Sequence, residues 1–211
     1  MDIFQVRDIL LSYKGQNLTE KYSEYGYNTP SNKGKFGLLI ENILGLNNNS
    51  IQEPDFGDFE LKCIPLKKLK NGKLTFKETV AITMINPDNI INTSFSESHL
   101  YNKLKKVLFV TYINDTIYDV HIFELNGTIY DEVKNDYDNI RKSIIMVGFP
   151  SLSSSMGKYI QPRTKGAGHG SISRAFYGRV SFLSEIIKKI GRAHVWTPVT
   201  SLSRMPSSAW K

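Results

Sequence analysis

Between Gly34 and Leu66 the chain reads GKFGLLIENILGLNNNSIQEPDFGDFELKCIPL, and this segment contains a helix, a turn and a strand in succession. The apolar residues from Phe36 to Leu44 recur at helical spacing, which predicts an amphipathic helix over about residues 33–44, with Gly45 as its C-terminal cap. Pro54 suits a turn or a strand start, because its fixed φ and missing N–H cost little there. The alternation after the turn predicts a strand that begins near residue 60.

The predicted strand carries an acid and a lysine on one face. Glu60 and Lys62 are two residues apart, so in a strand their side chains project to the same side. Asp55 lies in the turn that leads into this strand. Two carboxylates that converge on one point form a hard-oxygen site suited to Mg²⁺, and a lysine beside them can orient a metal-bound water. The segment therefore predicts a metal-dependent catalytic site.

A Glu-x-Lys pair alone is weak evidence, because the simplest interpretation is a solvated strand face. The chain contains a second copy at Glu132 and Lys134, in a segment whose pattern predicts a helix. Residues two apart do not share a helix face, so this copy does not form the same pair. Glu41 lies beside the apolar stripe of the predicted helix, where it is either an exposed carboxylate or a third acid that reaches the strand.

Composition indicates a globular chain with a basic bias. The 211 residues are 40% hydrophobic and 11% aromatic, and the formal net charge is +7, which favours a polyanionic partner. A single cysteine excludes an internal disulfide framework and a cysteine-based zinc site. The sequence has neither an apolar run of membrane-spanning length nor a signal peptide at its start, so we expect no membrane association and a cytoplasmic protein.

The rest of the chain predicts strands with intervening helices, which implies a mixed sheet covered on both faces. Asn71-Gly72 is a strong hairpin signal. The expected helices cover residues 2–13, 94–106, 131–147 and 175–190, and the expected strands cover residues 79–85, 107–113 and 118–125. Residues 148–179 are rich in Gly and Ser and carry five cationic residues without an acid. This composition predicts either a surface connection or a loop that a ligand orders, and Arg163 within it could pair with a guanine edge.

The segment 190–211 differs from everything before it. It contains no acid and both tryptophans, and it shows no helical or strand periodicity. It resembles the conceptual translation of a sequencing adaptor, with Trp196 and Trp210 on UGA codons. We therefore expect a domain over residues 1–189 followed by a non-native, disordered segment, the alternative being an ordinary basic extension.

Four blocks of the chain resemble, in order, those of the MutH-type endonucleases. This family includes a mismatch-repair nicking enzyme and the Sau-type restriction endonucleases that cut at GATC. The resemblance covers about residues 30–189, and its blocks are KGKFGLLIENILG, PDFGDFELKCIPL, FSESHLYNKLKKVLFV and KYIQPRTKGAGHGSISRAFYGRVSF. It implies a restriction-endonuclease-like (PD-(D/E)xK) α/β fold, a mixed β-sheet core flanked by helices with two lobes around a DNA cleft.

The resemblance also implies roles for individual residues. The positions that match the family's catalytic groups are Glu41, Asp55, Glu60, Lys62 and Lys103, and the three acids would hold Mg²⁺. Arg163 and Lys165 match the base-reading loop, and Tyr177 matches a tyrosine near the adenine whose methylation is sensed. Thr164 departs from the family pattern, since a proline is expected at that position.

The expected function is Mg²⁺-dependent hydrolysis of double-stranded DNA at unmethylated GATC by the catalytic domain of a type II restriction enzyme. The restriction enzymes of this type resemble two such domains in tandem, so we expect a C-terminal regulatory domain to be missing. Three alternatives stay open: a MutH-like strand-nicking enzyme, a non-cutting GATC-binding domain, and a nuclease of the same fold with another target.

Overall fold

The computed structural model describes the chain except for residues 27–33, 47–52, 167–171 and 194–211. Its larger sheet contains four strands in the order β2-β1-β4-β5, and its smaller sheet contains three in the order β3-β7-β6. The strands β1 and β4 are parallel, and all other neighbours are antiparallel. The strands are β1 (Glu60–Lys68), β2 (Leu74–Phe76), β3 (Val80–Met84), β4 (Lys106–Ile113), β5 (Thr116–Glu124), β6 (Ile160–Thr164) and β7 (Arg174–Gly178).

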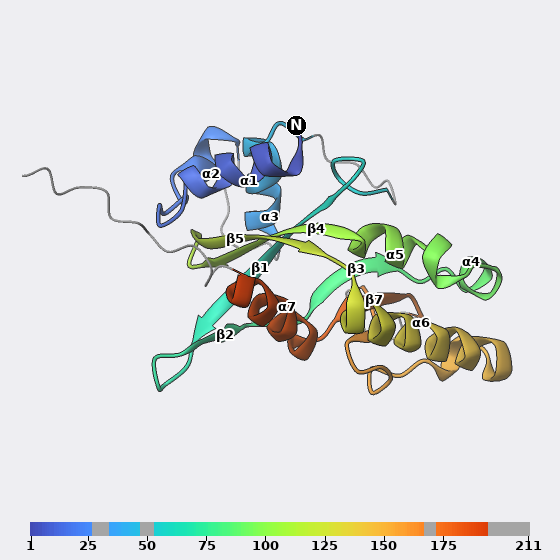
Figure 1. Ribbon diagram of the computed structural model, residues 1–211. Helices are drawn as coiled ribbons and strands as arrows, with labels where there is room; N and C mark the ends of the chain where they lie inside the picture. Colours follow the sequence, from blue (N-terminus) through green and yellow to red (C-terminus); the bar gives the residue numbers. More distant parts are fainter. Residues whose placement is uncertain (27–33, 47–52, 167–171, 194–211) are drawn as a thin grey trace, which may run out of the picture.

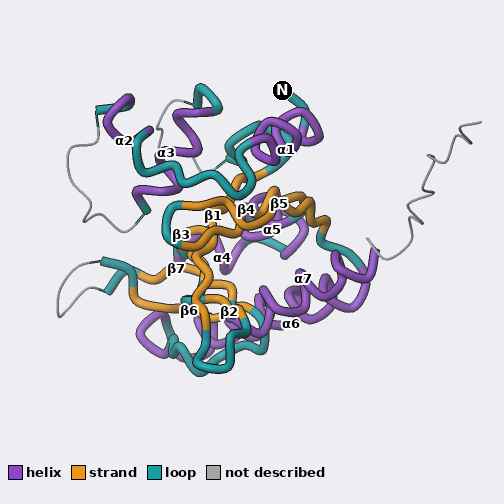
Figure 2. The backbone as a smooth tube through the Cα atoms, turned by 90° about the vertical axis from the view of Figure 1, so that its left-hand side faces the viewer, coloured by secondary structure: helices purple, strands orange, loops and turns teal. Residues whose placement is uncertain are grey.

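Helices lie on both sides of the larger sheet (Figure 1). The helices α1 (Ile3–Ser12), α2 (Lys21–Glu24) and α3 (Lys35–Ile43) lie above it, and α7 (Val180–Ala193) lies below it. The smaller sheet lies on the lower side with α6 (Gly127–Val147), as Figure 2 shows from another direction. The remaining helices are α4 (Pro87–Asn92) and α5 (His99–Leu104), with short 3₁₀ turns at Phe95–Glu97 and Phe149–Ser151. The predicted mixed α/β fold is confirmed.

The central strand β4 divides the hydrophobic core into two parts, because alternate side chains of a strand point to opposite faces. Leu108 and Val110 belong to the upper core, with the buried faces of α1 and α3. Val107 and Phe109 belong to the lower core, with α6 and α7. This division explains why the sequence from Lys106 to Ile113 is almost uniformly apolar, since both of its faces are covered.

The helix α3 ends in the cap that Gly45 predicts. Gly45 has φ +70°, and its N–H donates to the carbonyl of Asn42 at 3.0 Å, while Leu46 N–H donates to the carbonyl of Glu41 at 2.9 Å. These two bonds form a Schellman motif, which stops the helix one turn after Glu41. The cap therefore fixes Glu41 in the last turn of a helix that packs on β1.

Several predicted boundaries were wrong. The expected loop at 148–179 contains two strands, β6 and β7, because β7 pairs with both β6 and β3. For the same reason the last helix begins at Val180, after β7, and not at residue 175. The strand β3 lies at the edge of the smaller sheet and leaves Met84 38% exposed, so it is only partly buried.

The other predicted segments differ less from the observed helices. The helix α6 begins four residues earlier than expected, and the helix expected at 94–106 is a 3₁₀ turn followed by α5. The helix α7 continues past residue 189 to Ala193, and the rest of the segment 190–211 lies outside the described residues.

Candidate active site

A tight turn delivers Asp55 to the beginning of β1. Gly57 N–H donates to the carbonyl of Pro54 at 3.0 Å, and Gly57 has φ +77°, a conformation that favours glycine. The Asp55 Oδ2 atom accepts from the N–H of Leu61 at 3.0 Å, and the N–H of Asp55 donates to Oε2 of Glu60 at 3.3 Å. These bonds hold the carboxylates of Asp55 and Glu60 side by side at the start of the strand.

Glu60 is buried between two lysines. Its side chain is 1% exposed, Lys62 Nζ donates to Oε1, and Lys103 Nζ donates to Oε2 at 2.8 Å. The Lys103 ammonium also lies 3.9 Å from Oδ1 of Asp55. A buried carboxylate is costly unless it is paired and hydrogen-bonded, and both conditions are met here. Lys103 comes from α5, so the cluster joins segments more than forty residues apart.

Glu41 extends this cluster from α3. Burial raises the pKa of its carboxyl, and the negative charges of Asp55 and Glu60 raise that pKa further, while Lys62 and Lys103 oppose the shift. These interactions place Glu41 within electrostatic reach of all four other residues. The structure thus brings four of the residues predicted to be catalytic, Asp55, Glu60, Lys62 and Lys103, into one cluster, and Glu41 lies near enough for their charges to shift its pKa.

The carboxylates of this cluster are suitable ligands for a hard divalent cation, although they are not arranged around one point as the ligands of a metal ion are. Carboxylate oxygens are the ligands that Mg²⁺ prefers, and Asp55 and Glu60 lie adjacent. Within the described part of the chain, however, no three acidic, histidine or cysteine side chains are grouped to hold a metal ion. Both oxygens of Glu60 are also bonded to lysines.

The residues predicted to read DNA bases lie on the smaller sheet. Arg163 is exposed near the end of β6, and its guanidinium lies 5.1 Å from the ring centre of Tyr177 on β7. Arg163 Nη1 also donates to Oγ1 of Thr79 at 2.6 Å. Lys165 is exposed just beyond β6, where its N–H donates to the carbonyl of Ser173 at 3.0 Å. The base-reading candidates are therefore together, on a different sheet from the acidic cluster.

Sequence reasoning missed two residues that hold this second group in place. Asp136 on α6 is 2% exposed, and its carboxylate accepts the N–H groups of Lys158, Tyr159 and Ile160 at 2.7 to 2.8 Å. Arg179 donates from the other side to the carbonyls of residues 154, 156 and 157. Together they fix the chain as it enters β6. A signal existed, because Asp136 falls at a core position of the helical stripe that includes Val133 and Ile140.

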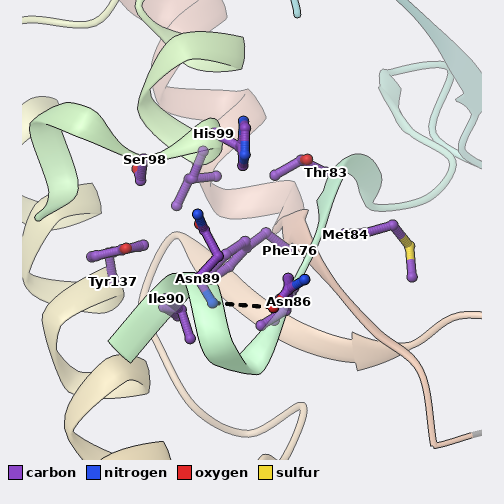
Figure 3. A pocket seen from close by; sticks show the side chains of 11 residues that line it. Thr83, Met84, Asn86, Asn89, Ile90, Ser98, His99, Tyr137 and Phe176 are labelled. Atoms are coloured by element: carbon purple, nitrogen blue, oxygen red, sulfur yellow. Dashed lines mark hydrogen bonds between the residues drawn. The ribbon is translucent and has the colours of Figure 1, made fainter. Parts of the chain in front are cut away.

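A small crevice lies apart from this site (Figure 3). Asn86 and Asn89 line it from the start of α4, and His99 and Tyr137 line it from neighbouring helices. Its volume of about 20 Å³ is enough for roughly one water molecule, far less than a ligand pocket requires. The Oδ1 atom of Asn86 accepts from the N–H of Asn89 at 3.1 Å, which caps α4. We therefore assign this crevice to packing and helix capping.

No helix among the described residues combines the length and apolar character needed to cross a membrane.

An Asp and a Glu-x-Lys at the start of a strand in a mixed sheet, with a further acid on a preceding helix, are the arrangement of the restriction-endonuclease-like fold. The chain has a fold of this kind. Residues 44–141 match the family model described as "MutH: DNA mismatch repair enzyme MutH".

Two relatives also link the chain to MutH-type proteins. The chain is 29% identical over 187 residues to the "Type II restriction enzyme Sau3AI" of Staphylococcus aureus, with 78% of this chain and 38% of the relative covered. It is also 29% identical over 203 residues to the "DNA mismatch repair protein MutH" of Shewanella woodyi, with 83% of this chain and 86% of the relative covered. The chain is therefore similar to MutH-type proteins over most of its length, and it spans less than half the length of the restriction enzyme.

Proposed function

We propose that this chain is the catalytic domain of a Mg²⁺-dependent type II restriction endonuclease that cuts DNA at unmethylated GATC sites in the cytoplasm. The observation that carries the proposal is the intact cluster of Asp55, Glu60, Lys62 and Lys103 at the start of β1. A domain that only bound DNA would not need a 1% exposed carboxylate between two ammonium groups, because such burial is costly.

Asp55 and Glu60 would hold the metal ion, with Glu41 assisting directly or through water. Bound Mg²⁺ would supply charge stabilisation at the scissile phosphate and a water of lowered pKa. Lys62 is 25% exposed, so its ammonium can face both Glu60 and an attacking water and keep that water in line. Lys103 is nearly buried and keeps the two carboxylates close together despite their like charge.

Arg163, Lys165 and Tyr177 would read the site. An arginine can make a bidentate contact with a guanine edge, and its position over an aromatic ring restricts its freedom. Tyr177 lies beside this arginine, so a methyl group on the adenine would meet a crowded surface. Methylation of GATC is therefore expected to block cutting.

A MutH-like strand nicker is the second candidate, and the similarity to relatives named as mismatch repair proteins favours it. The two candidates differ in product, because nicking converts a supercoiled plasmid to the open-circular form, whereas double-strand cutting gives linear fragments.

The test uses the 211-residue chain with Mg²⁺ and two matched plasmid preparations, adenine-methylated or unmethylated at GATC. Lys62→Ala is the inactive variant, and Lys142→Ala, at an exposed position on α6, is the matched control. The expected result is cutting of the unmethylated plasmid alone, which is lost in Lys62→Ala and kept in Lys142→Ala. Cutting that ignored methylation would contradict the GATC assignment, and undiminished cutting by Lys62→Ala would contradict the assigned site.

A further inference from the structure

The β1–β2 hairpin carries the most concentrated positive charge in the described part of the chain. Residues 67–77 read KKLKNGKLTFK, with five lysines and no acid. All five lysines are exposed. None of them forms an ion pair with any other described residue. Four other exposed lysines, by contrast, each pair with an acid: Lys14, Lys134, Lys158 and Lys188.

The hairpin is rigid at its base and projects from the sheet at its tip (Figure 1). Phe76 is 9% exposed in the lower core, where Leu66 packs against it, and α7 contacts β2. The turn closes with the N–H of Leu69 donating to the carbonyl of Lys73 at 2.8 Å. The lysines are therefore presented on an ordered ribbon and not on a loose loop.

Pairing of the strands sets three of the lysines on one face. Lys67 is opposite Thr75, and the N–H of Lys77 donates to the carbonyl of Pro65 at 2.9 Å. Because side chains alternate along a strand and paired residues share a face, Lys67, Lys73 and Lys77 project to one side. This is the face of β1 that α3, the helix of Glu41, covers nearer the start of the strand, whereas Glu60 and Lys62 project to the opposite face.

The hairpin is a direct continuation of the catalytic strand. Seven residues separate Glu60 from Lys67, which corresponds to roughly 23 Å at about 3.3 Å per residue. Along B-form DNA, where each step is about 3.4 Å, this distance equals roughly seven base pairs. The catalytic end and the basic end of β1 are thus separated by less than one turn of a duplex.

We propose that this basic hairpin binds the phosphate backbone of the DNA substrate outside the recognition site, about seven base pairs from the scissile bond. The inference rests on the proposed function and extends it, because it assigns a contact to flanking DNA that carries no sequence information. Each phosphate that a lysine neutralises releases condensed counterions, which makes the affinity depend on salt.

The test measures equilibrium binding of the full chain to two GATC duplexes in EDTA, so that no cutting occurs. One duplex has 30 base pairs and reaches past the hairpin, and the other has 12 and ends short of it. The variant replaces Lys67, Lys73 and Lys77 with glutamine. The matched control replaces Lys134, Lys142 and Lys188, three exposed lysines on α6 and α7, with glutamine.

On the 30-base-pair duplex, loss of three phosphate contacts should reduce the slope of log affinity against log salt by about 2.7. The wild type should then lose about 40-fold more affinity than the hairpin variant between 50 and 200 mM salt. The 12-base-pair duplex should bind both proteins alike, and the control variant should match the wild type on both duplexes.

Three outcomes would overturn this inference without affecting the proposed function. The first two are a hairpin variant with the same salt slope as the wild type on the long duplex, and a control variant that loses as much slope as the hairpin variant. An equal loss on both duplexes would also contradict it, because the contact would then lie inside the site. A wild type that binds neither duplex would overturn the proposed function as well.

Discussion

Replacing Lys103 with methionine tests how the acidic cluster is held together. The substitution keeps the length of the side chain but removes the ammonium that lies 2.8 Å from Glu60 and 3.9 Å from Asp55. Removing one partner of a buried ion pair costs about 3–5 kcal/mol. Glu60 keeps its bond to Lys62, so we expect the lower end, about 3 kcal/mol. For a protein of this size, such a loss lowers Tm by about 6–12 °C.

The same variant should respond more strongly to Mg²⁺. In the wild type the ammonium of Lys103 occupies an oxygen of Glu60 that a metal ion would use, so the lysine and the metal compete. Without the lysine, a tenfold gain in metal affinity would add about 1.4 kcal/mol of stabilisation at saturating Mg²⁺. This corresponds to a further rise of about 3–6 °C in Tm.

The assay is thermal unfolding of the wild type and Lys103→Met, in EDTA and across a Mg²⁺ titration. Lys142→Met provides an exposed control, and Glu60→Gln should abolish the response to Mg²⁺. A fall in Tm of less than about 2 °C in EDTA would refute the role of Lys103 as the buried counter-charge. An equal Mg²⁺ response in the wild type and Lys103→Met would refute the competition.

Three further predictions concern single residues. Burial and the charge of Asp55 raise the pKa of Glu41, so the metal-free wild type should lose stability as pH rises above the ordinary carboxyl range, and Glu41→Gln should not. The Tm curves of the two proteins, measured in EDTA from pH 4 to 7, should therefore diverge. Parallel curves would contradict the raised pKa. Asp136→Ala should lower the free energy of unfolding in urea by about 3–5 kcal/mol, since three backbone N–H groups lose their acceptor, and a loss below about 1 kcal/mol would contradict its anchoring role. Arg163→Lys keeps the positive charge but loses the planar guanidinium group that can form two hydrogen bonds to guanine. The preference for GATC over a site with an altered guanine should therefore fall about tenfold or more, while binding to unrelated DNA stays unchanged. An unchanged preference would exclude Arg163 as the base contact.

The acidic cluster was largely predictable because most of its parts are close in sequence. A turn, a strand with period two and a helix with a glycine cap are local patterns, and together they place Asp55, Glu60 and Lys62 within a few residues of one strand end. Lys103 is different. Nothing local distinguishes it from its neighbour Lys105, and only the resemblance to a family pointed to it. Its role depends on α5 packing beside β1, which is a long-range contact.

The segment from residue 148 to residue 179 was the main failure of sequence reasoning. Its Gly and Ser content suggested a loop, and Pro162 argues against a central strand. The structure accommodates the proline because β6 lies at the edge of its sheet and pairs only with β7. Each of these strands has five residues, too few for a clear alternation, so their pairing depends on β3 far away in the chain. Asp136 adds a further long-range constraint: its place in the buried stripe of α6 marks it as unusual, but the three backbone N–H groups that it accepts lie more than twenty residues away.

The distribution of charge gives the two ends of β1 different tasks. At its start, every charge has a partner: Glu60 is bonded to two lysines, and Asp55 lies beside one of them. This near-neutral cluster attracts DNA only weakly, because opposite charges a few ångströms apart cancel at longer range. At the other end, none of the five exposed lysines forms an ion pair with a described residue, so their field extends over about one Debye length, roughly 8–10 Å, into solvent. The function proposed above thus assigns attraction of the DNA backbone and hydrolysis of a particular bond to opposite ends of a single strand. Mutations at the hairpin should change affinity and its salt dependence, and mutations at Glu60 or Lys62 should change the rate of cutting with little effect on binding.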